Sequence, residues 1–86
     1  MPERVIVTLS CKGQQADFEL SARVPLKRME EPLRQALRAS FPQLSLRGYG
    51  IALRTPEGLL SPEYTLEEYG VFDGSILQVE LSPKAQ

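Results

Sequence analysis

One stretch of helical periodicity with strand patterns on both sides constrains this chain most. Across residues 25–41, apolar side chains recur at spacings of three and four and charged ones take the other side, which predicts an amphipathic helix packed on a sheet. Pro25 suits a first helical position, whereas Pro32 inside a continuous helix removes a hydrogen bond at a cost of about 3 kcal/mol. Because the apolar spacing keeps its phase across Pro32, we expect one kinked helix. The alternative is a loose turn over residues 25–30 and a helix that starts near Glu31.

Two strand patterns precede the helix. Residues 4–9 are β-branched and apolar, and residues 17–21 alternate polar and apolar side chains, which is typical of half-buried strands. Residues 10–14 between them predict a hairpin turn in which Gly13 adopts a positive φ. The side chains expected to face inward are Val5, Val7, Leu9, Phe18 and Leu20.

Further strand patterns follow the helix. Residues 49–54 predict a third strand, residues 59–60 a very short one, and residues 75–81 a last strand with Leu77, Val79 and Leu81 inward. Before that last strand, residues 65–70 predict a single helical turn. The features that predict the turn are a capping box of Thr65 and Glu68 and a stop at Gly70.

The resulting order is β-β-α-β-β-(short turn)-β, in a single domain over residues 1–86 with a core over 4–81 and a tail over 82–86. The last strand is apolar enough to be central, so we place it parallel to the first strand. This arrangement is an α+β fold of the β-grasp type: a mixed four- to five-stranded sheet with one α-helix packed across it.

The end of the chain carries a family resemblance. Residues 64–81 are similar to the end of a ubiquitin-like domain, in which a short turn precedes the last strand. Within that fold the chain resembles the YukD/EsaB family of small bacterial ubiquitin-like proteins. The resemblance lies in V-P-L-K-R at residues 24–28 and in L-x-x-Y-G-V-x-D-G-x-x-L at residues 66–77, similar to the family's L-x-x-C-G-I-x-N-G-D-x-L.

That resemblance implies a cytoplasmic accessory or regulatory component of a bacterial type VII (WXG100/Esx) secretion system, which acts by protein–protein interaction. Related domains form the soluble part of a membrane component of the same machinery, so a stand-alone role and a docked role are both open. We therefore expect a protein partner, a type VII secretion subunit.

The composition argues against catalysis. The chain has no histidine, the commonest general base and metal ligand near neutral pH, and its single cysteine forms neither an intrachain disulfide nor a CxxC metal motif. Cys11, expected in the hairpin turn, has no neighbouring base and is interpreted as structural. We expect no enzymatic activity, no catalytic residues, no cofactor and no metal site. A lone cysteine also agrees with a reducing compartment.

Charge is unevenly distributed along the chain. Residues 1–54 hold nine basic and five acidic residues, net +4, whereas residues 55–86 hold one basic and six acidic residues, net −5. Such asymmetry can orient a partner, but we favour the interpretation as an ordinary solvated surface. The basic residues of the predicted helix are not interleaved with aromatics, so we expect no nucleic-acid partner. The apolar runs are too short for membrane insertion.

Covalent conjugation is the activity to test first in a ubiquitin-like chain. Residues 82–86 lack the terminal Gly-Gly that conjugation requires, so we expect no conjugation. The alternative is a modifier or sulfur carrier with a processed or truncated C-terminus. The central positions of ubiquitin's apolar recognition patch fall near Arg54 and Glu80, which argues against ubiquitin-receptor binding. The candidate partner-binding residues, on the sheet face or helix edge, are Arg34, Arg38, Arg47, Tyr49 and Arg54.

Overall fold

The chain begins with a tight hairpin. In this computed structural model, which describes residues 3–83, β1 (Arg4–Cys11) and β2 (Gln14–Ser21) pair antiparallel over their full lengths. The two residues between them, Lys12 and Gly13, have φ values of 50° and 84°. Positive φ at both central residues is what a two-residue turn needs to match the twist of its strands. Both strands are longer than predicted, and Cys11 ends β1, so its expected place in the turn was wrong.

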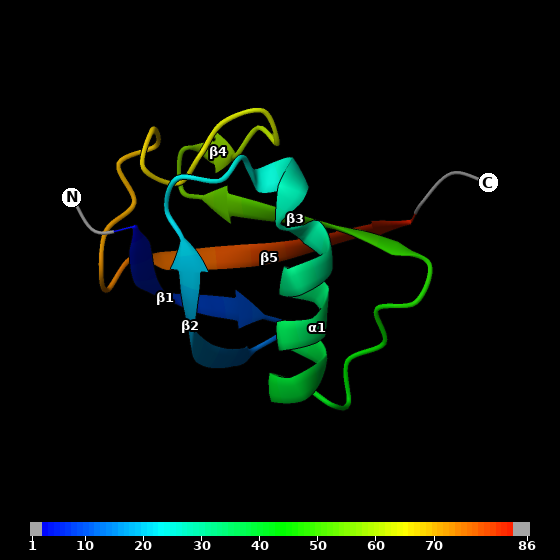
Figure 1. The fold of residues 1–86 in the computed structure, drawn as a ribbon. Coiled ribbons are helices and arrows are strands. Elements are labelled where there is room, and N and C mark those ends of the chain that lie inside the picture. The colour runs from blue at the N-terminus through cyan, green and yellow to red at the C-terminus, as the bar shows by residue number, and fades with distance from the viewer. Residues whose placement is uncertain (1–2, 84–86) are drawn as a thin grey trace.

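The last strand of the described residues occupies the centre of the sheet. Strand β5 (Ile76–Pro83) runs parallel to β1 on one side and antiparallel to β3 (Tyr49–Thr55) on the other, with β4 (Gly58–Leu59) at the edge. The order β2-β1-β5-β3-β4 confirms the predicted mixed β-grasp sheet (Figure 1). Residues 82–83, predicted as tail, extend β5 and pair with β3, and residues 84–86 of that tail lie outside the described residues.

Two separate helical segments take the place of the single kinked helix. A 3-10 turn, η1 (Leu26–Arg28), is followed by α1 (Glu30–Ser40), and Met29 between them has φ −101° and ψ 0°. Pro32 is therefore the third residue of α1, where an N–H has no intrahelical acceptor and its absence costs no bond. The expectation of one kinked helix was wrong, and the alternative of a turn followed by a helix is confirmed.

The core lies between α1 and the face of the sheet that the helix crosses (Figure 1). The inward positions predicted for β1 and β2 are all buried, and so is Leu77 of β5, whereas Val79 and Leu81 pack against the core half-buried. Neither helical segment within residues 3–83 is long and apolar enough to cross a membrane. Arg34 departs from the predicted pattern: it was expected on the solvated side of the helix and is only 6% exposed.

The connection between β4 and β5 is held by side-chain caps. The Thr65 N–H donates to Glu68 Oε1 at 2.9 Å, and the Glu68 N–H donates to Thr65 Oγ1 at 3.1 Å, which confirms the capping box. Residues 65–70 form the single helical turn expected, in which the Tyr69 N–H donates to the Thr65 carbonyl at 3.3 Å and Gly70, with φ 75°, ends the turn. Further along, Asp73 Oδ1 accepts the Ile6 N–H at 2.8 Å, which ties the connection to β1.

Candidate functional site

The predicted partner-binding residues lie on two sides of the molecule. The Arg34 guanidinium meets the start of β3 at the Tyr49 carbonyl, 2.7 Å away, and Arg47 is two residues before this strand. Arg38 is one helical turn after Arg34 and therefore lies on the same side of α1. Arg54 belongs to the opposite face of the sheet, because its neighbour on β3 faces the core and side chains alternate along a strand. Four of the five residues thus lie on the helix side of the molecule, where Arg34 contacts Tyr49.

Arg34 fastens α1 to the loop before β3. Its Nη1 donates to the Leu46 carbonyl at 2.8 Å, and its Nη2 donates to the Tyr49 carbonyl and to Glu30 Oε2, the latter at 3.1 Å. Its Nε lies 3.5 Å from Glu31 Oε1. With the guanidinium engaged within the chain and buried, Arg34 acts on this surface by holding the loop in place.

The sequence contained a signal for this buried role. Glu30 and Glu31 precede Arg34 by four and three residues, the two spacings at which helical side chains meet. A charged residue with two such partners can be buried at the edge of an apolar helix face, as Arg34 is here. The polar pattern of a helix does not by itself separate that case from a solvated arginine.

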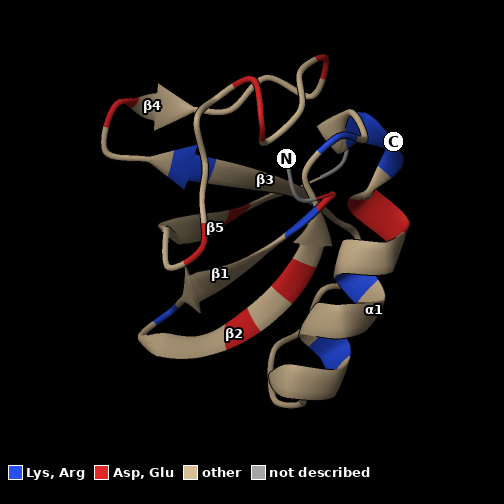
Figure 2. Ribbon diagram, turned by 60° about the vertical axis from the view of Figure 1, so that its left-hand side comes forward, with Lys and Arg blue, Asp and Glu red and all other residues tan. Residues whose placement is uncertain are grey.

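Three exposed side chains remain on the helix side of the molecule. Arg38 and Arg47 are exposed and form no ion pair among residues 3–83, and Tyr49 is 37% exposed. We call these three residues the basic surface. In Figure 2, α1 is red in its first turn and blue farther along, and further red lies on β2 and on the loops that follow β3.

Ion pairs within the fold neutralise much of the charge asymmetry along the chain. Three ion pairs each join a basic residue before position 55 to an acidic residue after it, and all of them are at least partly exposed. Exposed pairs of this kind each contribute about 0–1 kcal/mol to stability. They also reduce the charge asymmetry that the sequence predicts. The three pairs are Arg23–Glu67 at 3.3 Å, Lys27–Glu63 at 3.0 Å and Arg54–Glu80 at 3.1 Å.

The outer face of the sheet combines a charged pair with exposed aliphatic residues. Arg54 Nε lies 3.1 Å from Glu80 Oε1 on this face. Ile6 and Ile76, on the adjacent strands β1 and β5, are 51% and 59% exposed. Sequence reasoning missed these two residues. The signal for them was the strand alternation, which places them opposite the inward positions.

Cys11 is the one nucleophilic side chain considered from the sequence, and it is buried at the end of β1. Burial raises the pKa of the Cys11 thiol, and the nearby Lys12 ammonium only partly opposes this effect. The thiol therefore stays protonated at neutral pH, and a protonated thiol is a poor nucleophile. Residues 3–83 contain no group of three or more His, Cys, Asp or Glu side chains arranged to hold a metal ion.

Comparison with known proteins adds a family and a fold. The family model described as "WXG100 protein secretion system (Wss), protein YukD" matches residues 4–79. A search of curated proteins gives no significant match.

Among solved structures, the EccD5 ubiquitin-like domain from Mycobacterium xenopi aligns with a TM-score of 0.82 and 23% identity, over 98% of this chain and 100% of that domain. The ubiquitin-like domain of the Mycobacterium tuberculosis type VII secretion protein EccD1 aligns with a TM-score of 0.76 and 22% identity, over 88% and 96%. A chain of the MycP5-free ESX-5 inner membrane complex aligns with a TM-score of 0.79 and 24% identity, over 99% of this chain but only 22% of that one. At these identities the likeness establishes the ubiquitin-like fold.

Proposed function

Because the chain belongs to the YukD family of the WXG100 secretion system, we propose that it is a non-catalytic ubiquitin-like adaptor of a bacterial type VII secretion system. It acts in the cytoplasm as an accessory or regulatory component and binds another subunit of the machinery by protein–protein contact. The observation that carries the proposal is the family match over residues 4–79, which includes the whole sheet except the end of β5.

The membrane complex is the proposed place of action. A domain of the same fold makes up part of a chain in the ESX-5 inner membrane complex. By analogy, the partner of the present chain is a subunit of such a complex that reaches the cytoplasm. The chain either docks there as a separate protein or forms one domain of a larger component.

The basic surface is the proposed contact. Arg38 and Arg47 offer charges that no acidic side chain within residues 3–83 neutralises, and Tyr49 adds an amphipathic ring beside them. Arg34 supports this surface from below by holding the Leu46–Tyr49 loop. Arg54 is a weaker candidate because it is already paired on the opposite face of the sheet. This arrangement favours an acidic patch on the partner.

The proposed mode of action is non-covalent. The alternative, a modifier or sulfur carrier with a processed C-terminus, changes the protein covalently, whereas adaptor binding does not. A thiocarboxylate changes the intact mass of the native protein, and conjugation produces species of higher mass. An intact mass free of both changes favours the adaptor.

The decisive experiment is affinity purification of the tagged protein from its native host, together with export of a WXG100 substrate in a deletion strain. We expect type VII subunits to co-purify and export to change on deletion. Arg38→Glu and Arg47→Glu each weaken co-purification, whereas Arg4→Glu, an equal charge change on the opposite sheet face, leaves it intact. Unchanged export together with no co-purifying subunit would refute the proposal.

A further inference from the structure

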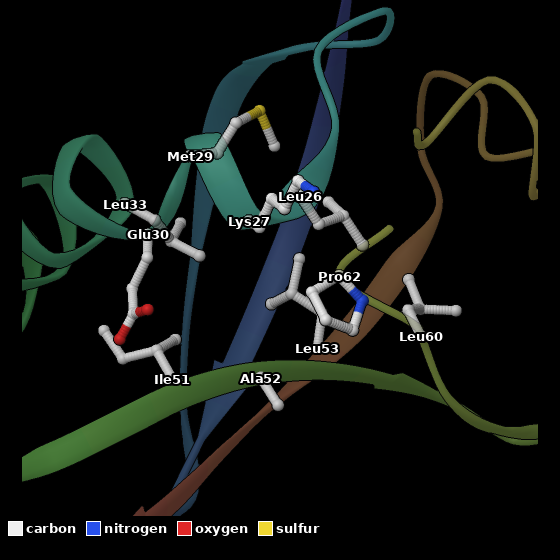
Figure 3. A pocket seen from close by; sticks show the side chains of 10 residues that line it. All are labelled: Leu26, Lys27, Met29, Glu30, Leu33, Ile51, Ala52, Leu53, Leu60 and Pro62. Atoms are coloured by element: carbon white, nitrogen blue, oxygen red, sulfur yellow. The ribbon is translucent and has the colours of Figure 1, made fainter. Parts of the chain in front are cut away.

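A small apolar cavity opens between the start of the helical region and the middle of β3 (Figure 3). Its volume is about 150 Å³, and the buried side chains of Leu33, Leu53 and Leu60 line it, with Lys27 and Glu30 among its remaining walls. An apolar cavity of about this volume accommodates a benzene-sized group. It therefore has room for one aliphatic or aromatic side chain.

The backbone edge of β3 beside this cavity is only partly used. Strand β4 pairs with just the last two residues of β3. Farther back, the Leu53 carbonyl accepts the Leu60 N–H at 2.9 Å, and the Tyr49 carbonyl accepts Arg34 Nη2 at 2.7 Å. Alternate residues of a strand direct their N–H and C=O to the same edge, so those of Ile51 face this edge too. No strand within residues 3–83 pairs with Ile51 on that side.

Two basic residues belong to the chain segments that border this edge. Arg28 belongs to η1, between two residues that line the cavity, and Arg47 is two residues before the start of β3. Both are exposed, and neither forms an ion pair among the described residues. Glu30, the carboxylate at the cavity, is held by Arg34 at 3.1 Å. The charge of this region therefore favours an acidic ligand.

We propose that this groove binds an extended, acidic segment of the protein partner. One Leu, Ile or Phe side chain of the segment enters the cavity, its backbone pairs with the N–H and C=O of Ile51, and acidic residues on either side approach Arg28 and Arg47. Strand addition supplies affinity through main-chain hydrogen bonds, and a side-chain pocket supplies specificity. The inference rests on the proposed function, because it specifies which kind of segment the partner contributes.

A defined peptide tests the groove with the purified full chain. The probe is acetyl-Glu-Asp-Val-Leu-Val-Glu-Asp-amide, titrated into isotope-labelled protein and followed by NMR. We expect saturable shifts at the Ile51 and Leu53 amides and slower hydrogen exchange at Ile51. Replacing the central Leu of the peptide with Ala should weaken binding at least about tenfold, because the cavity loses its side chain. Binding without shifts at Ile51, shifts confined to Ile6 and Ile76, or no shifts at millimolar peptide would overturn the proposal.

Variants separate this inference from the proposed function. Arg28→Glu should weaken peptide binding about fivefold, in line with an exposed charge contact, and Arg4→Glu should leave it unchanged. Ile51→Phe fills the cavity, keeps its N–H and should abolish the discrimination between Leu and Ala peptides. If secretion subunits co-purify equally with Arg28→Glu, Ile51→Phe and the unaltered protein, the groove proposal fails and the proposed function stands. If the peptide binds as expected, no subunit co-purifies and export is unchanged in the deletion strain, the proposed function fails instead.

Discussion

Replacing Arg34 with alanine should destabilise the protein more than an alanine substitution at any other polar residue of α1. The change removes a buried guanidinium that donates to two loop carbonyls and meets two glutamates. The Leu46 carbonyl then keeps only the Tyr49 N–H as a donor, at 3.1 Å, and the loop before β3 loses its attachment to the helix. The fold itself should survive, because the apolar core does not depend on this side chain.

The magnitude follows from those contacts. A hydrogen bond to a charged group contributes roughly 1.5–3 kcal/mol, and breaking a buried ion pair costs about 3–5 kcal/mol. Arg34 is 6% exposed, but its partner Glu31 is largely exposed, so the lower half of that range applies. We expect a loss of about 3 kcal/mol in the free energy of unfolding. A chain of 86 residues has a total stability of about 4–13 kcal/mol, so the variant remains folded and measurable.

Urea denaturation followed by circular dichroism measures this loss, with Arg38→Ala as the matched control. Arg38 lies one turn later on the same helix and is exposed, so its substitution should change the unfolding free energy by less than about 0.5 kcal/mol. Arg34→Lys keeps the charge but not the planar fork, and it should fall between the two, at about 1–2 kcal/mol. Equal effects of Arg34→Ala and Arg38→Ala, within about 0.5 kcal/mol, would refute the assigned role of Arg34.

Three smaller predictions concern other contacts. Asp73→Ala removes the acceptor of the Ile6 N–H and should cost about 1 kcal/mol in the same denaturation assay, and a neutral variant would contradict the cap. A double-mutant cycle with alanine at Arg54 and Glu80 should give a coupling free energy between the two side chains below about 1 kcal/mol, and 1 M salt should decrease it. A larger coupling free energy that salt does not decrease would show that the pair is not exposed. Because burial raises the pKa of the Cys11 thiol, iodoacetamide at pH 7 should alkylate the folded chain more slowly than the urea-unfolded chain. The alkylation rate of the folded chain should rise with pH. Mass spectrometry measures both rates, and equal rates would contradict the burial of Cys11.

Local pattern was sufficient for most of the fold and insufficient at the helix start. Strand alternation and the Gly13 turn predict the hairpin, and the apolar last strand predicts its central place. The continuity of the helix could not be inferred from apolar spacing, because a 3-10 turn and an α-helix in succession can keep the same face toward the sheet. What decides the break is the backbone at Met29, whose dihedral angles no residue pattern specifies.

The candidate site shows a different limit. Net charge by segment is a sum over residues, and it does not show that Arg54 and Lys27 are neutralised by acidic residues far along the chain. Burial of Arg34 likewise depends on carbonyls of a loop twelve or more residues away. The cavity beside Ile51 was not foreseen, because its walls come from η1, α1, β3 and the residues after β4.

The central place of β5 also determines when the chain can fold. Its hydrogen bonds join β1, near the start of the described residues, to β3. Without β5, the β1–β2 hairpin and β3 do not belong to one continuous sheet. Contacts between such distant residues raise the contact order and slow folding. During synthesis, the sheet cannot close until residues 76–83 have left the ribosome. Until then β1 exposes an unpaired inner edge on which a chaperone, or another nascent chain, could act.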